Sequence, residues 1–251
     1  MIEDLPQWVS SNVLIFCRVG TMLMLLPGYS SVRVPSQIRL FLALAFSFAI
    51  SPLIAVAIPA PTADQPLAFA RVAMSELILG GFLGLQVRIA FEALHFVATL
   101  IAQSIGYAGL GGPGLADEGE QGAAFVSLVT MIATVLLFAA NLHVRMLLVL
   151  VDSYRVLPPG DPLNMQPAVD MLMRRMGETL LLSLRLASPF VVVSILINLC
   201  IALINRVSPV IPSFFIAQPL LLFLGLLLFL IAAPDFFDQF TQALAAWIDR
   251  I

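Results

Sequence analysis

The sequence predicts an all-helical, membrane-associated protein. Hydrophobic residues make up 61% of the chain and charged residues only 11%, so a solvated surface is difficult to build. The mean hydropathy is strongly positive. Most long apolar runs reach the ~20 residues that span a bilayer. They lack the period-two alternation of strands, and backbone groups in hydrocarbon must bond within their own segment, so helices are favoured.

Six apolar helical regions are predicted, arranged as hairpins. They cover roughly residues 9–26, 38–58, 67–105, 123–151, 179–204 and 210–233. The third and fourth regions are too long for one straight span each, so each is either a bent helix or two shorter ones. Glycines in the third region, at 80, 81 and 84, allow bending or a close approach of backbone. The clearest hairpin is the last one, which breaks near residues 206–212.

The last residues, 234–251, predict an amphipathic helical tail. Its apolar residues share the spacing of one helical face: Phe237, Phe240, Leu244, Trp247, Ile248 and Ile251. The polar side of the tail is acidic, which favours packing on a partner protein over lying on lipid head groups. We therefore expect a single domain over residues 1–251, with N-terminal helices over about 1–178, a C-terminal hairpin over about 179–233, and this tail.

The positive-inside rule conflicts with six simple spans. If Arg33 and Arg39 lie in the cytoplasm, the acidic loop near residues 117–120 also lies inside. The loop expected to carry Arg155, Arg174 and Arg175 then lies outside, against the rule. If the third region crosses the membrane twice, both of those loops agree with the rule, but Arg206 then lies outside. An unusual mode of membrane insertion therefore remains an alternative to simple hairpins.

Several classes of function are excluded by composition. All twelve basic residues are Arg and the net charge is −3, so there is no polybasic arm for nucleic acid or anionic lipid. Cys17 and Cys200 lie in apolar segments, where a thiol acts as a small hydrophobe. The two histidines, His95 and His143, do not sit in a ligand-spaced cluster. We expect no catalytic residues, no metal and no cofactor, because no nucleophile is accompanied by an oriented base.

Ionisable residues within or beside the apolar regions are candidate functional sites. Placing one ionised side chain at the centre of a bilayer costs about 2.5–3.5 kcal/mol on insertion scales unless the side chain is paired with an opposite charge or hydrated. One interpretation is a substrate or proton pathway. The alternative, which we favour, is burial of the charges at helix or subunit contacts. The residues are Arg18, Glu76, Arg88, Glu92, Arg145, Arg185 and Arg206.

The glycine-rich connection after the third region, residues 106–122, contains the glycine spacing of the dinucleotide-binding motif G-x-G-x-x-G, but not its structural context. An apolar helix precedes it and acidic residues follow, so we reject dinucleotide binding. The glycines permit close backbone approach, and the connection is either a bland flexible loop or a functional one. Its candidate residues are Gly106, Tyr107, Gly109, Leu110, Gly111, Gly112, Pro113, Gly114, Gly119 and Gly122.

Three phrases of the sequence resemble the FliR family of flagellar export-gate proteins. They are FCRVGTMLMLLPGYSSVRVPSQIRLFLALAFSFAISP, LLFAANLHVRMLLVLVDSYRVLPPG and LASPFVVVSILINLCIALINRVSPVIPSFFIAQPL. Their order and the chain length match the family almost end to end. The late phrase departs from the family pattern of Pro-Gln-Met-Asn followed by Gly, and the middle loop is more acidic than expected.

The resemblance implies a non-enzymatic subunit of the type III flagellar export apparatus in the bacterial inner membrane, within the flagellar basal body. Its implied partners are FliP-like, FliQ-like and FlhB-like subunits, membrane lipid and exported unfolded flagellar proteins. The family also implies that the connection at residues 106–122 plugs the channel and that much of the assembly lies above the bilayer. The last point would account for the conflict with the positive-inside rule.

Two alternative functions remain open from the sequence. The first is the equivalent export-gate subunit of a virulence injectisome, often called SctT or SpaR, which shares the fold. The second is a secondary transporter for a small solute that uses Arg18, Arg88, Glu92 and Arg185 near the midplane. Transporters usually show internal repeats, and none is convincing here.

Overall fold

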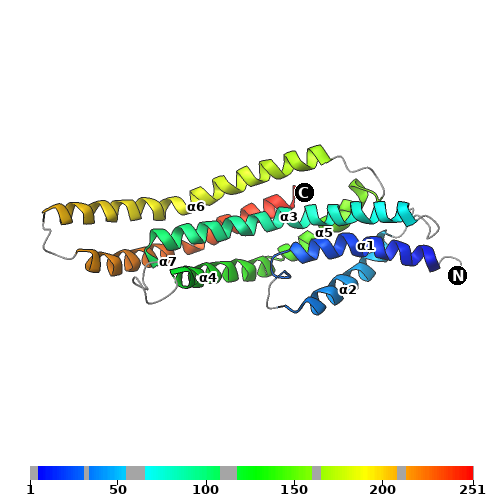
Figure 1. The fold of residues 1–251 in the computed structure, drawn as a ribbon, viewed down its shortest axis with the longest axis horizontal. Helices are drawn as coiled ribbons and strands as arrows, with labels where there is room; N and C mark the ends of the chain where they lie inside the picture. The colour runs from blue at the N-terminus through cyan, green and yellow to red at the C-terminus, as the bar shows by residue number, and fades with distance from the viewer. Residues whose placement is uncertain are drawn as a thin grey trace. The chain divides into compact units, whose positions relative to one another are not determined.

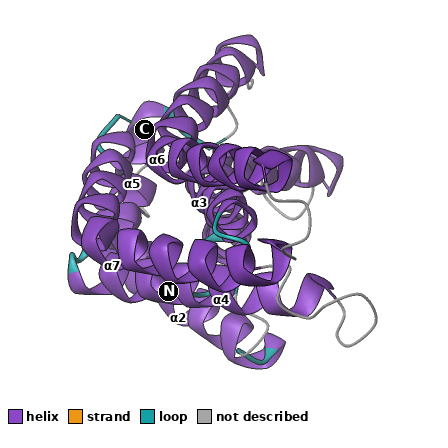
Figure 2. Ribbon diagram, turned by 90° about the vertical axis from the view of Figure 1, so that its left-hand side faces the viewer, coloured by secondary structure: helices purple, strands orange, loops and turns teal. Residues whose placement is uncertain are grey.

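The computed structural model describes residues 5–30, 34–54, 66–107, 118–159, 165–207 and 213–250. All regular secondary structure in these ranges is helical (Figure 2). The helices, labelled in Figure 1, are α1 (Leu5–Leu25), α2 (Ser36–Ile54), α3 (Pro66–Ser104), α4 (Glu118–Ala139), α5 (Leu142–Val156), α6 (Met165–Val207) and α7 (Ser213–Ile248). The prediction of an all-helical fold is confirmed.

Six of these helices are long and apolar enough to cross a membrane: α1, α2, α3, α4, α6 and α7. The third predicted region forms one helix of 39 residues, whereas the fourth divides into α4 and α5. The division occurs at Asn141, whose φ of 55° lies in the left-handed region. Asparagine tolerates that conformation better than most residues, because its short polar side chain can bond locally. With 15 residues, α5 is too short to span a bilayer.

The loop expected to carry three arginines is much shorter than the topology argument assumed. Arg155 lies in the last turn of α5, and Arg174 and Arg175 lie inside α6, which begins at Met165. The prediction was wrong because helices of these lengths extend beyond their apolar portions and carry charged residues with them.

The tail is not a separate element, because α7 continues through Pro234 to Ile248. Its apolar face is buried within this chain: Phe237, Phe240, Leu244 and Ile248 are each less than 9% exposed. The expectation that this face packs on a partner protein was therefore wrong, since residues distant in the sequence already cover it. Ile251 lies outside the described residues.

The chain divides into two compact units. Unit 1 comprises residues 1–89, 138–175 and 244–251, and in it α2 packs on α1 and also contacts α5. The core of unit 1 includes fully buried Leu14, Ile15 and Val19 of α1. Unit 2 comprises residues 90–137 and 176–243. Its interior is rich in aromatic rings, with Phe229 in edge-on contact with Phe125 and Phe236.

Within unit 1, α3 approaches α1 closely through two glycines four residues apart. A Cβ at Gly80 would overlap the carbonyl oxygen of Arg18 and the hydroxyl of Thr21. A Cβ at Gly84 would lie 2.8 Å from the carbonyl oxygen of Met22. Paired small residues with this spacing let helix backbones meet directly in apolar surroundings.

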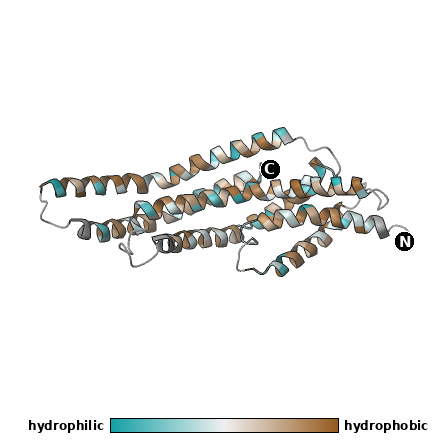
Figure 3. Ribbon diagram, viewed as in Figure 1, coloured by the Kyte–Doolittle hydropathy of each residue, from teal (hydrophilic) through white to brown (hydrophobic). Residues whose placement is uncertain are grey.

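The helices are apolar along most of their length, as the brown colouring shows (Figure 3). Many of their large apolar side chains are exposed. The clearest case is α6, where only 11% of its membrane-capable window is buried. Its exposed large side chains extend from Val169 to Val207. An apolar surface of this extent marks contact with lipid or with other proteins.

Candidate functional site

A buried ion pair lies at the centre of unit 1. The Arg18 Nε donates to Glu76 Oε2 at 2.6 Å, and its Nη2 donates to Glu76 Oε1 at 2.9 Å. Both side chains are 0% exposed. Residue 18 faces α3 from α1, and Glu76 lies one helical turn before Gly80, on the same face of α3. The close approach at Gly80 therefore brings the carboxylate within reach of the guanidinium.

The remaining donors of Arg18 are satisfied at the end of α5. Its Nη1 donates to Ser153 Oγ at 3.1 Å, and its Nη2 also donates to the carbonyl oxygen of Leu157 at 3.0 Å. The guanidinium carbon lies 3.9 Å from the centroid of the Tyr154 ring, in cation–π geometry. Burial raises the pKa of the Tyr154 phenol far above its ordinary value, although the charge of Arg18 opposes that rise.

This arrangement ties three helices together and encloses the charge. Two predicted sites, Arg18 and Glu76, are thus brought together, with Ser153, Tyr154 and Leu157 as partners that the sequence did not reveal. A bidentate arginine–carboxylate pair with its other donors satisfied is among the stronger polar contacts in proteins. Because the pair is wholly enclosed, it cannot contact a solute in this conformation.

The other five candidate charges are exposed in this chain: Arg88, Glu92, Arg145, Arg185 and Arg206. Of these, Arg145 forms a surface ion pair with Asp249 at 3.3 Å, an exposed contact of little energetic weight. A position in the last turn of α6 lets Arg206 interact favourably with the helix dipole. Their burial at subunit contacts stays a prediction.

One buried arginine was not singled out by the sequence. Arg175 is 7% exposed, and its Nη2 donates to the carbonyl oxygen of Trp247 at 3.0 Å within unit 1. The same carbonyl, in the last turn of α7, also accepts from the backbone N–H of Arg250 at 3.3 Å, so the Arg175 bond adds to the helix end and ties α6 to it. The sequence argument missed it because residue 175 was assigned to a loop. Extending the helical pattern back from residue 179 would have placed it on α6.

The start of the glycine-rich connection is held in place within unit 2. Gly106 follows the last turn of α3 with φ of 73°, a left-handed conformation that glycine adopts without strain. Its N–H donates to the carbonyl oxygen of Gln103 at 3.1 Å. A Cβ at Gly106 would lie 3.0 Å from Gln218 Oε1 and 3.2 Å from Leu221 Cδ2. The residue thus ends α3 while packed closely against α7.

A second glycine, on α7, allows the same close contact between α7 and the end of α3. A Cβ at Gly225 would overlap the Ile105 side chain, so α7 lies against the end of α3 with no room for a side chain at this position. Beyond this contact, the Tyr107 ring lies 5.8 Å from Phe125 on α4, and Phe125 lies 5.0 Å from Phe229 on α7. Tyr107 at the start of the connection and Phe125 on α4, beyond its end, therefore belong to one aromatic cluster.

The predicted loop is shorter than expected, because α4 begins at Glu118. Gly119 and Gly122 lie in the first turns of that helix. The candidate residues Gly109, Leu110, Gly111, Gly112, Pro113 and Gly114 lie outside the described residues. Within the described ranges, no group of three histidine, cysteine or acidic side chains is arranged to hold a metal ion.

Comparison with known proteins identifies relatives over most of the chain. Residues 9–247 match the family model described as bacterial export proteins, family 1. The flagellar biosynthetic protein FliR of Caulobacter vibrioides is 28% identical over 216 residues, covering 85% of this chain and 84% of that protein. Proteins of the same name from Aquifex aeolicus and Escherichia coli are 28% and 29% identical, each over 91% of this chain and 87% of its relative.

Proposed function

Because the chain belongs to the bacterial export proteins, family 1, as its resemblance to the FliR family indicated, we propose that it is a structural and gating subunit of the flagellar export channel. In this proposal it assembles with FliP-like, FliQ-like and FlhB-like subunits in the inner membrane at the flagellar basal body, and unfolded flagellar proteins pass through. The names of its relatives and its six membrane-capable helices support this assignment.

The observation that carries the gating role is the anchoring of the glycine-rich connection. Gly106 and Tyr107 at its start and Phe125 beyond its end belong to one packed cluster in unit 2. Between Tyr107 and Glu118 the chain contains four glycines and one proline. A segment with few side chains between two fixed ends can enter a narrow lumen and move aside without steric clash. Its apolar side chains, Leu110 and Leu115, would exclude hydrated ions from a closed lumen.

The exposed apolar faces support the assembly role. They extend along α6 from Val169 to Val207, roughly 57 Å at 1.5 Å rise per residue. The hydrocarbon core of a bilayer is about 30 Å thick. Lipid alone therefore does not cover the whole length of this apolar surface unless the helix is steeply tilted, and neighbouring subunits are the natural cover for the remainder.

The experiment uses the full chain expressed with FliP-like and FliQ-like partners and reconstituted in vesicles. Deleting residues 109–114 removes the most glycine-rich part of the connection while retaining its anchors. We expect ion conductance through the assembled channel to rise. The control is Gly177→Ala, because a Cβ at Gly177 meets no atom within 4 Å. Unchanged conductance in a deletion variant that still assembles would contradict the plug.

The transporter alternative receives no support from the site. Of its four proposed residues, Arg18 is fully enclosed and paired, while Arg88, Glu92 and Arg185 are exposed on their helices. Solute transport by the purified chain alone would nevertheless refute the export proposal. The injectisome alternative is tested by complementation, because a flagellar subunit restores motility to a strain that lacks its own relative and an injectisome subunit does not.

A further inference from the structure

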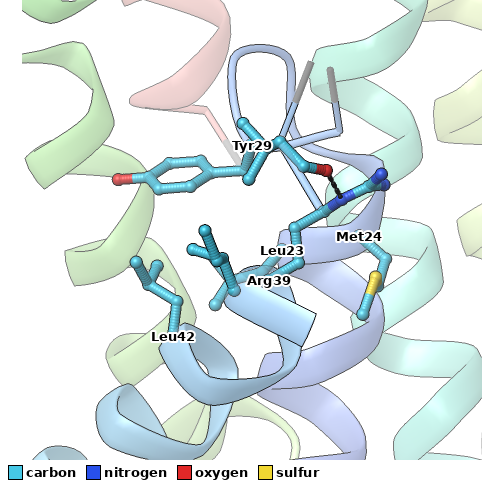
Figure 4. Close-up of a pocket in the computed structure, with 7 residues that line it drawn as sticks. Leu23, Met24, Tyr29, Arg39 and Leu42 are labelled. Carbon is cyan, nitrogen blue, oxygen red and sulfur yellow. Dashed lines mark hydrogen bonds between the residues drawn. The ribbon is translucent and has the colours of Figure 1, made fainter. Parts of the chain in front are cut away.

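The pocket at the corner where α1 leads into α2, inside unit 1, is too small to hold a ligand (Figure 4). Its lining is almost wholly apolar, and it has room for about one water molecule. The Arg39 Nε beside it donates to the carbonyl oxygen of Val34 at 3.0 Å, the contact drawn as a dashed line. Binding is therefore to be expected on the exposed faces of the helices rather than in this cavity.

One face of α3 within unit 2 is polar, although the helix is otherwise apolar. Between Ala90 and Gln103 the polar side chains are Glu92, His95, Thr99 and Gln103, spaced three or four residues apart. Residues with this spacing lie on one face of a helix, here over about 16 Å at 1.5 Å rise per residue. Thr99 is half-buried and the other three are exposed. We call these four residues the polar stripe.

The other sides of this part of α3 are covered by the rest of unit 2. Ser183 Oγ on α6 donates to the carbonyl oxygen of Ala93 at 3.4 Å. The Phe240 ring of α7 packs edge-on against Phe91, with centroids 5.6 Å apart. Four side chains on the covered sides are at most 1% exposed: Leu94, Val97, Ala98 and Ile101. The polar stripe is thus the side of α3 that the described residues of unit 2 leave largely open.

The exposed surface of α6 in the same unit has the opposite chemistry. It is mainly apolar, and Leu184, Ile195 and Leu199 are 49%, 61% and 54% exposed. A surface that meets lipid or an apolar subunit is built in this way. Ionisable and hydrogen-bonding side chains on an apolar helix instead face a water-filled cavity or a polar partner. The polar stripe therefore borders water or polar protein rather than lipid.

The stripe ends where the glycine-rich connection begins. The carbonyl oxygen of Gln103 accepts a hydrogen bond from the N–H of Gly106 at 3.1 Å, so the last residue of the stripe belongs to the turn that ends α3. In the proposed function the connection enters the lumen, and the surface of α3 beside its start then borders that lumen. Glu92 is the one carboxylate of the stripe, so the stripe can hydrogen-bond a polypeptide without strongly retaining chains of one charge.

We propose that the polar stripe is part of the hydrated wall of the export channel and contacts the unfolded polypeptide in transit. Its carboxylate, imidazole, hydroxyl and amide groups exchange hydrogen bonds with water and with the backbone of the passing chain. This role rests on the proposed function, and it places Glu92 in water rather than at the subunit contact expected from the sequence.

The test places single cysteines in the full chain, assembled with FliP-like and FliQ-like partners in cells that are then permeabilised. Cys17→Ala and Cys200→Ala first remove the native thiols. A trimethylammonium methanethiosulfonate reacts with the thiolate, which forms in water and is disfavoured in apolar surroundings. We expect Thr99→Cys to react roughly 10-fold faster than Leu100→Cys, equivalent to about one pKa unit in thiolate ionisation. The two positions are adjacent and both half-buried, but only Thr99 lies on the stripe.

A stalled substrate tests the contact with polypeptide. A flagellar export substrate fused to a domain that stays folded should block the channel and slow the labelling of Thr99→Cys and Gln103→Cys. Labelling that the stalled substrate leaves unchanged would overturn the proposal. Fast labelling in the chain without its partners but slow labelling in the assembled channel would also overturn it, because the stripe would then be a subunit contact.

The conductance measurement separates this proposal from the proposed function. If deletion of residues 109–114 raised conductance while Thr99→Cys and Leu100→Cys reacted equally, the proposed function would stand and only the role of the stripe would be refuted.

Discussion

At the scale of single residues, the buried arginine of α1 shows how a charge is accommodated in a largely apolar chain. Arg18 donates to Glu76, to Ser153 and to the carbonyl of Leu157, and it faces the Tyr154 ring. Removing two charges from water costs several kcal/mol per ion, which good geometry must offset. Such a pair fixes the register of the helices it joins more clearly than it adds stability.

This view predicts an asymmetry between single and double substitutions. Arg18→Met leaves the Glu76 carboxylate buried without its cation and should destabilise the fold by roughly 3–5 kcal/mol. The double variant Arg18→Met with Glu76→Leu removes both charges and should recover most of that loss. Thermal unfolding of the purified protein in detergent measures both. A double variant no more stable than Arg18→Met would show that the pair contributes more than charge compensation.

At the scale of elements, the contact between α1 and α3 depends on glycine. Glu76, Gly80 and Gly84 recur every four residues along α3, and together they face the turns of α1 that contain Arg18 and Met22. The glycines set how closely the backbones approach, and this distance in turn allows the carboxylate to reach the guanidinium. The spacing was visible in the sequence, but the helix it faces was not.

Two adjacent glycines provide a matched test of this contact. Gly80→Ala places a methyl group against the Arg18 carbonyl and the Thr21 hydroxyl, so the helices must separate, at a cost of roughly 1–3 kcal/mol. At Gly81 a Cβ meets no atom within 4 Å. Gly81→Ala should therefore be neutral or stabilising by up to ~1 kcal/mol, because alanine favours helix. Equal thermal stability of the two variants would contradict a tight α1–α3 contact.

At the scale of the whole molecule, the sequence predicted the class of structure well and its long-range contacts poorly. Composition and run length were sufficient for an all-helical fold, because burial of backbone groups in apolar segments leaves few alternatives. The partner of Arg18 lies 58 residues away, and no local pattern indicates it. The break at Asn141 falls within a continuous apolar run, so hydropathy could not locate it. The prediction that the tail packs on a partner protein was wrong because a hydrophobic helix face does not indicate which surface covers it.

The length of the exposed apolar surface of α6 gives a prediction about assembly. Met173 and Ile204 are 60% and 52% exposed and lie 31 residues apart on this helix, roughly 46 Å. A hydrocarbon core of about 30 Å does not contain both unless the helix is tilted steeply. At least one of them should therefore contact a protein subunit.

Single substitutions Met173→Glu and Ile204→Glu distinguish the two environments. A glutamate at a subunit contact should abolish co-purification of the FliP-like and FliQ-like partners while the chain still inserts in the membrane. A glutamate facing lipid should instead reduce insertion. Glu178→Asp, which retains an acid at an exposed position between them, is the control. We expect at least one of the two variants to lose its partners. If both variants retained their partners, lipid or water would cover α6 at both positions, and the assembly role assigned to α6 would be wrong.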